Sequence, residues 1–398
     1  MPAFRLLLAS LAVSSLGDWM YNVALLAVVY ERTESPTWLA VTTAARILPI
    51  VVLGPIGGVI ADRFDRRRVI IASDLLCAAL MVALAAVVAF DLPVVLAPLV
   101  AAAATLASAA HPPAVAASTP RLVDASALQR ANATRVAIGQ AAIVAGPAIG
   151  AGVLAVSSPA VAILVNAATF LVSVALVTAI PAGPAFRPGA EGERAHVLAD
   201  LRDGVDALRG APAALRMVAA DIVCSAVYGI LTVTLVLVAG RVGAGPGGYG
   251  LLIGAFGVGG LIGAAVAGRL DGAQWRRTLA IALVLVALPV AALGIAQTLW
   301  VALALGLVAG TGAVVAEILS ETALPRLVDD EVLARAYGLT LPAALSGIVI
   351  GSLIGGPLVA LLGLTGALVA TGGGVLVLAF LLLRRPLTVA VALPIPSV

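Results

Sequence analysis

The chain has 398 residues, of which 62% are hydrophobic and 11% are charged, and its mean hydropathy is +1.16. A composition this apolar excludes a soluble globular protein and predicts a chain embedded in a bilayer. The formal net charge of +3 comes from arginines that follow a membrane topology, so it does not indicate nucleic-acid binding.

Apolar stretches long enough to cross about 30 Å of hydrocarbon recur along the chain. They predict an all-α membrane protein with twelve transmembrane helices near residues 6–30, 38–60, 69–90, 94–118, 132–157, 160–182, 215–239, 248–268, 277–297, 300–321, 336–362 and 366–383. The first stretch carries Asp18 and opens a regular series, so we expect it to be retained rather than cleaved as a signal peptide.

All basic side chains are arginines, and they divide unevenly between the two sides of this topology. Twenty fall on one side, only Arg32 and Arg241 fall on the other, and Arg46 lies within a span. The positive-inside rule makes the richer side cytoplasmic, with both termini there. We therefore expect a multi-pass protein of a bacterial inner (plasma) membrane.

The first two spans each place one charge near the middle of the membrane, Asp18 and Arg46. A charge at that depth costs about 3 kcal/mol or more, so we expect the two to form an ion pair. Protonation of the carboxylate would break the pair, which makes both residues candidates for proton coupling. The alternative is a permanent bridge between the two helices. Asn22 lies one helical turn beyond Asp18 and is a candidate for lining the same cavity.

Residues 58–68 join the second and third spans and read GVIADRFDRRR. This segment resembles the loop signature of the major facilitator superfamily, Gly-x-x-x-Asp-Arg-x-Gly-Arg-Arg, and departs from it at Asp65. The resemblance implies a conformational latch in which Asp62 faces the cytoplasmic start of the eleventh helix, near Ala336. The latch residues that it implies are Gly58, Asp62, Arg63, Arg66 and Arg67. The alternative for the arginines is that they only enforce topology.

The fourth span contains His111 followed by Pro112 and Pro113, which must break the helix. His111 is a further proton candidate, and a hydrogen-bonded packing residue is the alternative. The fifth span contains Gly139, Gly146, Pro147 and Gly150, which resemble the glycine-proline motif of antiporting exporters. That resemblance implies a seal against proton leak or a hinge, whereas plain helix packing would use the same residues.

Several further charges lie near the cytoplasmic ends of spans or in loops. We expect acids and arginines there to form gate pairs that stabilise one closed state. The gate candidates are Asp74, Arg121, Arg130, Arg135, Asp221, Glu321 and Arg326. Glu317 lies deeper on the face that it shares with Glu321 and is a second proton candidate.

Few polar side chains remain to line a substrate cavity: besides Asn22, the candidates are Gln140, Asn166 and Tyr228. Because unmatched polar groups are expensive to bury, a sugar or nucleotide pocket would need more of them. An apolar or amphipathic substrate fits this composition better.

The chain repeats itself, since the segment PRLVD at 120–124 returns at 325–329. Gly146 and Gly150 return as Gly351 and Gly355 at the same offset of 205 positions. We therefore predict two six-helix halves, 1–182 and 215–398, joined by a cytoplasmic linker at 183–214 that contains an amphipathic helix. Parallel repeats of this kind are typical of secondary transporters.

Taken over the whole chain, these motifs resemble the drug:proton antiporter branch of the superfamily, which includes macrolide efflux proteins and the enterobactin exporter. The resemblance implies a monomer that exports hydrophobic or amphipathic small molecules in exchange for protons. The alternatives are a lipid or lysolipid flippase, an importer of a hydrophobic metabolite, and a non-transporting membrane sensor. A cavity that reaches Asp18 would argue against the sensor.

No residue pattern in the chain indicates enzyme chemistry. The sequence has no lysine, and therefore no phosphate-binding loop lysine, and no metal-spaced His and Cys cluster. We expect no cofactor and no metal.

Overall fold

The computed structural model describes residues 2–124, 127–187, 209–210, 212–245, 247–267, 275–327 and 330–384. Every regular element within these ranges is helical. The first half of the chain contains α1 (Pro2–Thr33), α2 (Pro36–Arg63), α3 (Arg66–Ala89), α4 (Leu96–Ser108), α5 (His111–Leu122), α6 (Leu128–Val156), α7 (Pro159–Thr178) and the short 3-10 turn η2 (Pro184–Phe186). The second half contains α9 (Pro212–Arg241), α10 (Gly248–Ala267), α11 (Trp275–Leu293), α12 (Leu299–Leu327) and α13 (Asp330–Leu383).

The helices account for the predicted membrane passes. The described residues contain 11 segments long and apolar enough to span a bilayer, and α4 and α5 together form one of them. The last of these segments has 41 residues, which is about twice what one crossing needs. Within it, Gly363 has φ 69° and ψ 171°, a left-handed conformation that glycine tolerates best. This break separates the eleventh and twelfth predicted spans, so the predicted fold class is confirmed.

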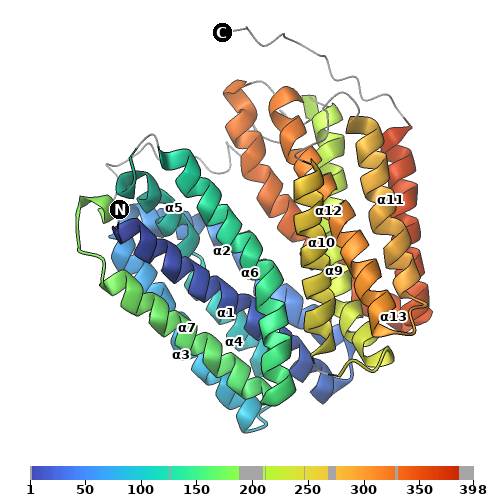
Figure 1. Cartoon of the computed structure of the whole chain (residues 1–398), viewed down its shortest axis with the longest axis horizontal. Coiled ribbons are helices and arrows are strands. Elements are labelled where there is room, and N and C mark those ends of the chain that lie inside the picture. The colour runs from blue at the N-terminus through green and yellow to red at the C-terminus, as the bar shows by residue number, and fades with distance from the viewer. Residues whose placement is uncertain are drawn as a thin grey trace.

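The helices form two bundles (Figure 1). In the first, α1 packs against α6 and α7, while α3 packs against α4 and α7. In the second, α9 packs against α13, and α12 packs against α10 and α11. Contacts between the bundles run mainly from α6 to α10 and from α2 to α13.

The repeated glycines occupy equivalent packing positions in the two bundles. A Cβ atom added to Gly146 would clash with Trp19 Cβ and lie 3.1 Å from the Leu16 carbonyl oxygen, both of α1, and one added to Gly351 would lie 2.8 Å from the Ala226 Cα of α9. The same pair of helices therefore approaches closely in each half, because neither contact leaves room for a side chain.

The two arginines on the arginine-poor side hold equivalent helix ends. Arg32, in the last turn of α1, donates from Nη2 to the Val88 carbonyl at 2.6 Å and forms a 3.0 Å ion pair with Asp91, just beyond the end of α3. Arg241, in the last turn of α9, donates to the Gly294 carbonyl that follows α11. Each arginine thus satisfies backbone oxygens that a helix end leaves without partners.

The bundles meet at one end of the molecule. A Cβ on Gly250 of α10 would lie 2.6 Å from the Pro147 carbonyl of α6, and one on Gly356 of α13 would lie 3.1 Å from Thr37 Cα of α2. Figure 1 shows the bundles diverging toward the opposite end, where α1 begins and α13 ends. The molecule is therefore closed between its halves at the end that holds the α1–α2 connection.

Candidate transport cavity

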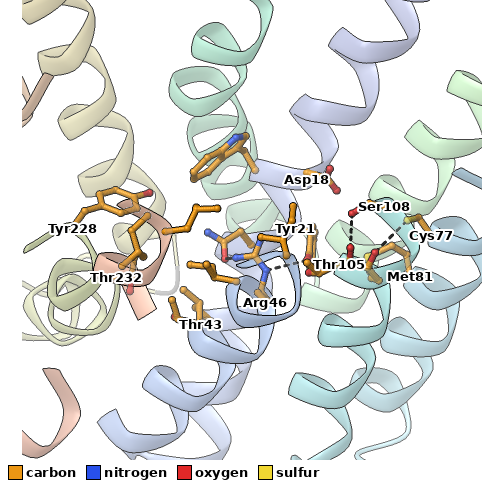
Figure 2. Close-up of a pocket in the computed structure, with 18 of the residues that line it drawn as sticks. Asp18, Tyr21, Thr43, Arg46, Cys77, Met81, Thr105, Ser108, Tyr228 and Thr232 are labelled. Atoms are coloured by element: carbon orange, nitrogen blue, oxygen red, sulfur yellow. Dashed lines mark hydrogen bonds between the residues drawn. The ribbon is translucent and has the colours of Figure 1, made fainter. Parts of the chain in front are cut away.

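A cavity of about 400 Å³ lies between the two bundles (Figure 2). Its walls come from α1, α2, α3, α4 and α7 of the first half and from α9 and α13 of the second. The polar side chains in the wall are Asp18, Tyr21, Asn22, Thr43, Arg46, Thr105, Ser108, Tyr228 and Thr232. Large apolar side chains, including Ile50, Met81, Phe170 and Ile348, make up most of the remainder. The described residues therefore do not form the solidly packed core that a non-transporting sensor would have.

Arg46 is held in the cavity wall by two neighbouring residues of α1. Its Nε donates to the Tyr21 hydroxyl oxygen at 3.0 Å, and its Nη1 donates to Asn22 Oδ1. The guanidinium carbon also lies 5.1 Å from the centre of the Tyr21 ring, within cation–π range. Because arginine does not lose its proton in proteins, the cavity keeps a fixed positive charge.

Asp18 also lines the cavity, one turn before Asn22. Its Oδ1 accepts a hydrogen bond of 3.3 Å from Asn166 Nδ2 of α7. Asn166 is fully buried, and its own Oδ1 accepts from the Thr169 hydroxyl at 3.0 Å. That bond orients the amide, since its oxygen is occupied and its NH₂ group is left to face the carboxylate.

The predicted direct ion pair between Asp18 and Arg46 is wrong for this conformation. The guanidinium reaches the side chains of Tyr21 and Asn22 instead, about one turn further along α1. Asp18 interacts with Arg46 only through longer-range electrostatics. The carboxylate is consequently stabilised by an amide and remains exposed to the cavity.

The other predicted cavity residues divide into two groups. Asn22 and Tyr228 line the cavity, and the Tyr228 ring lies 5.6 Å from that of Phe256. Gln140 and Asn166 do not line it: Gln140 is exposed on α6, and Asn166 is buried behind Asp18.

Sequence reasoning missed the cavity hydroxyls. Thr105 donates to the Ala101 carbonyl of its own helix, and Ser108 donates to the Thr105 carbonyl. Serine and threonine make such bonds in many membrane helices, so these residues carry no signal in the sequence that would mark them as cavity residues.

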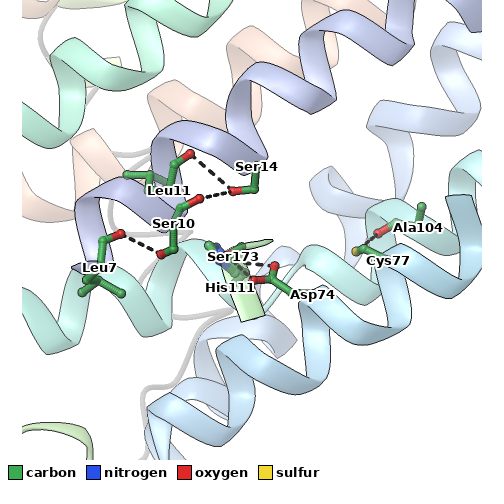
Figure 3. A network of polar contacts seen from close by, with 9 residues as sticks. All are labelled: Leu7, Ser10, Leu11, Ser14, Asp74, Cys77, Ala104, His111 and Ser173. Carbon is green, nitrogen blue, oxygen red and sulfur yellow. Dashed lines mark hydrogen bonds and ion pairs between the residues drawn. The ribbon is translucent and has the colours of Figure 1, made fainter. Parts of the chain in front are cut away.

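Asp74 does not have the arginine partner that the gate prediction assigned to it. Its Oδ1 lies 3.6 Å from His111 Nε2, and its Oδ2 accepts a 2.5 Å hydrogen bond from the Ser173 hydroxyl (Figure 3). Arg68, the closest arginine in sequence, is exposed at the start of α3. Asp74 lies two turns further into the helix, on its buried face.

Arg66 and Arg67, in the first turn of α3, bind backbone carbonyls of their own half. Arg67 donates to the Val177 and Thr178 carbonyls at 3.2 and 2.7 Å, at the end of α7. A cation at this position interacts favourably with the negative end of the helix dipole. Arg66 donates to the Ala117 carbonyl at 3.3 Å. Asp65, which departs from the superfamily signature, accepts from the Arg68 backbone N–H at 3.0 Å and caps α3.

The remaining latch and gate residues are spread over both halves. Arg63 is exposed, and Gly58 has open space where a side chain would project. Arg121 donates to the Arg187 carbonyl at 3.0 Å rather than to an acid. Arg135 and Asp221 are half-buried on α6 and α9. Glu317, the second proton candidate, is exposed on α12.

Some predictions fall outside the described part of the chain. These are the side chains of Asp62, Arg130, Glu321, Arg326 and Ala336, and most of the linker with its amphipathic helix, at residues 188–208. The latch and the linker helix therefore stay predictions. Among the described residues, no group of three or more His, Cys, Asp or Glu side chains is placed to hold a metal ion.

The glycine-proline motif of α6 lies between α1 and α10. Gly146 and Gly150 contact α1 closely, and the Pro147 carbonyl faces Gly250 of α10. Gly139 makes no such approach. These contacts favour helix packing as the role of Gly146 and Gly150, and they place Pro147 at the junction between the halves.

Comparison with known sequences gives a consistent family. The model of the transmembrane secretion effector family matches residues 1–396. The chain is 27% identical over 267 residues to an uncharacterized MFS-type transporter of Bacillus subtilis, covering 66% of this chain and 63% of the relative. It is 31% identical over 150 residues to macrolide efflux protein A of Streptococcus pyogenes, with 37% of each chain covered.

A third relative is the multidrug efflux pump Tap of Mycobacterium tuberculosis, 29% identical over 193 residues, with 47% of this chain and 46% of the pump covered. The matched regions thus span less than two thirds of each of these curated relatives.

Solved structures of transporters share the fold at low sequence identity. A mutant of the nucleoside transporter NupG matches with a TM-score of 0.79 at 14% identity, covering 96% of this chain and 99% of that one. A bacterial homolog of the human lysosomal transporter Spinster, in an inward-facing and unoccupied conformation, matches with a TM-score of 0.74 at 13% identity, covering 96% and 97%. The chain therefore belongs to the transmembrane secretion effector family of the major facilitator superfamily and is a multi-pass membrane protein.

Proposed function

We propose that this transporter exports hydrophobic or amphipathic small molecules in exchange for protons that bind at Asp18. The observation that carries the proposal is the composition of the cavity between the halves: one carboxylate and one fixed cation in a largely apolar wall. The efflux functions in the names of two relatives support the outward direction.

The charges of the cavity supply a coupling mechanism. With Asp18 ionised, the carboxylate balances Arg46 and the cavity is neutral overall. With Asp18 protonated, the cavity carries the net charge of Arg46 and repels a cationic substrate. Proton binding and the binding of an amphipathic cation therefore compete, which is what an antiporter requires.

Apolar walls favour substrates with little hydrogen-bonding demand. The described cavity offers hydroxyl groups and one amide, Asn22, besides its two charges. Burying a strongly polar substrate there would leave many of its groups without partners.

If the arginine-rich side is cytoplasmic, the conformation described above is inward-facing, since the halves meet at the opposite end.

The test is gradient-driven uptake into inside-out membrane vesicles, using erythromycin and the lipophilic cation ethidium as probes. We expect wild type to accumulate at least one probe when the vesicle interior is made acidic, and Asp18→Asn to lose this uptake. The matched control is Glu31→Gln, which neutralises an exposed acid on the same helix and should transport like wild type.

Each outcome bears on the proposal. Uptake that survives in Asp18→Asn would keep export but remove Asp18 as the coupling residue, leaving Glu317 as the next candidate. Absence of uptake in wild type would contradict drug export and favour a lipid or lysolipid flippase, or import.

A further inference from the structure

A buried acid–base pair lies within the first half, apart from the cavity wall. The Asp74 side chain is 2% exposed and the His111 side chain 9% exposed, and their closest atoms, Oδ1 and Nε2, are 3.6 Å apart. The Ser173 hydroxyl donates to the other carboxylate oxygen. Three helices, α3, α5 and α7, thus place an acid, a base and a hydroxyl together.

The surroundings of this pair contain few other charges. Helix α3 packs mainly against α4, α5 and α7, and α4 and α7 contain no titratable residue. On α5 the only other charge is Arg121, which donates to backbone carbonyls near η2. On α3 itself, Cys77 lies one turn away, and the buried Arg66 lies two turns away and donates to the Ala117 carbonyl of α5.

Two more distant elements also contribute charges. Helix α2 makes a minor contact with α3, and its described charged side chains are Arg46 in the cavity wall and the exposed Arg63. From α1, Asp18 is joined to the same helix as Asp74, because Asn166 of α7 donates to Asp18 and Ser173 of α7 donates to Asp74. Asp74 therefore has a histidine as its close partner and another carboxylate as a second neighbour.

Electrostatics limits how many protons this arrangement holds. A pair with one proton is neutral overall, whether the proton is on the carboxylate or on the imidazole. A pair without a proton leaves a buried net negative charge, which is costly, and that charge would face a second carboxylate whenever Asp18 is ionised. Loss of a proton from the pair is therefore favoured when Asp18 takes one up, and the two sites are linked.

The position of the pair connects it to moving parts. His111 follows Ala109 and Ala110, the break between α4 and α5. Helix α2 packs directly on this break, because a Cβ on Gly57 would lie 2.6 Å from the Ala109 carbonyl carbon. Helix α4 also supplies Thr105 and Ser108 to the cavity wall. A change in the cavity that moves α2 or α4 would therefore act on the Asp74–His111 contact.

A polar face of α1 runs between the two sites. Ser10, Ser14 and Asp18 recur every fourth residue, so they share one side of the helix. Ser10 and Ser14 are buried, and both hydroxyls donate to carbonyls of α1. Figure 3 draws Ser10 and Ser14 in one view with Ser173, Asp74 and His111.

We propose that the Asp74–His111 pair is a second proton-binding site of this transporter, which takes up and releases one proton per cycle in linkage with Asp18. The proposal rests on the proton-coupled function given above. In each cycle the pair binds one proton from solution and returns one to solution, so no other reactant is needed.

The sequence makes this pair accessible to a direct measurement, because the chain contains only two histidines, His111 and His196. We would record ¹⁵N NMR spectra of histidine-labelled protein in lipid nanodiscs from about pH 5 to 9, the range in which histidines titrate. The variant His111→Gln identifies the His111 signals by their loss, and His196→Gln is the matched control that should leave them unchanged.

We expect Asp74→Asn to move the His111 titration by about one pH unit or more, the usual effect of removing a close charge. Asp18→Asn should move it by a smaller but measurable amount through the linkage. His111 signals that respond neither to pH nor to Asp74→Asn would overturn the proton site. A shift with Asp74→Asn but none with Asp18→Asn would overturn the linkage.

Transport gives a second readout in the same vesicles that test the proposed function. The ratio of protons to erythromycin or ethidium moved should be lower by one proton in Asp74→Asn than in wild type. An unchanged ratio would contradict the proposal, while thermal unfolding of the purified variant shows whether it is folded. Because the NMR titration needs no substrate, loss of the transport proposal and loss of this pair's proton site are distinguishable.

Discussion

Arg46 illustrates how single residues define this cavity. Its guanidinium is planar and donates in two directions, to the hydroxyl of Tyr21 and to the amide oxygen of Asn22. By taking these two partners, it leaves Asp18 without a close cation. The carboxylate can therefore exchange a proton without first breaking an ion pair, and the arginine still supplies a positive charge to the cavity.

At this scale we predict that Arg46→Lys lowers transport about tenfold or more. Lysine keeps the charge but cannot reproduce the two-direction contact, and one lost hydrogen bond to a charged group costs about 1.5–3 kcal/mol. The measurement is the initial rate of ethidium uptake in inside-out vesicles at equal protein amounts. Tyr21→Phe, which removes only the hydroxyl, should have a smaller effect. Equal rates for Arg46→Lys and wild type would contradict the role given to the two hydrogen bonds of the guanidinium.

Helix α6 is the element that links the two halves. Its Gly146 and Gly150 bring it close to α1, and its Pro147 carbonyl faces Gly250 of α10. A side chain at any of these glycines would separate helices whose backbones now touch. The contact between Pro147 and Gly250 joins the two halves. It is therefore specific to the conformation in which this end is closed, because rocking of the halves must open it.

We predict that Gly250→Ala destabilises this closed end. The added Cβ would lie 2.6 Å from the Pro147 carbonyl and 3.0 Å from Val23 Cγ1, and overpacking of this kind typically costs about 1–3 kcal/mol. Thermal unfolding of purified protein should show a lower Tm, with slower transport in vesicles. Gly139→Ala is the control, since that position has open space; a Tm for Gly250→Ala equal to that of the control would contradict the packing argument.

The whole molecule is arranged as two bundles that meet at one end and diverge at the other (Figure 1). At the closed end, α2 contacts α13, and α6 contacts α10. Alternating access requires both contacts to separate while the packing within each bundle persists. Arg32 and Arg241 contribute to that persistence, because each ties the first helix of its half to the end of the third helix.

A cross-link across this end tests the movement. A Cβ on Gly356 would lie 3.1 Å from Thr37 Cα, so cysteines at these two positions are close enough for a disulfide. We predict that oxidation of Thr37→Cys/Gly356→Cys reduces transport to background and that a reductant restores it. The single variants should be insensitive to oxidation, as Cys77 and Cys224 are buried. Full transport by quantitatively cross-linked protein would show that this end does not open.

The predictive power of the sequence differed between fold and site. Hydropathy identified the spans because a bilayer offers the backbone no hydrogen-bonding partner, so each crossing must be a helix of fixed minimal length. Asp18, Arg46 and Asn22 were identifiable as cavity candidates because polar and charged groups within a span are rare and costly. The hydroxyls of Thr105 and Ser108 were not, since they bond to their own helix.

The sequence by itself determined that the chain crosses a membrane repeatedly, that its halves are related, and which few charges lie within the spans. Only the tertiary structure decided the partners of those charges. Arg46 binds Tyr21 and Asn22 rather than Asp18, and Asp74 meets His111 rather than an arginine. The reason is that burial in the membrane follows from the local composition of each span, whereas a contact between helices depends on how each helix is rotated and how deep it lies. Small residues such as Gly146 and Gly57 set this rotation and depth through close packing.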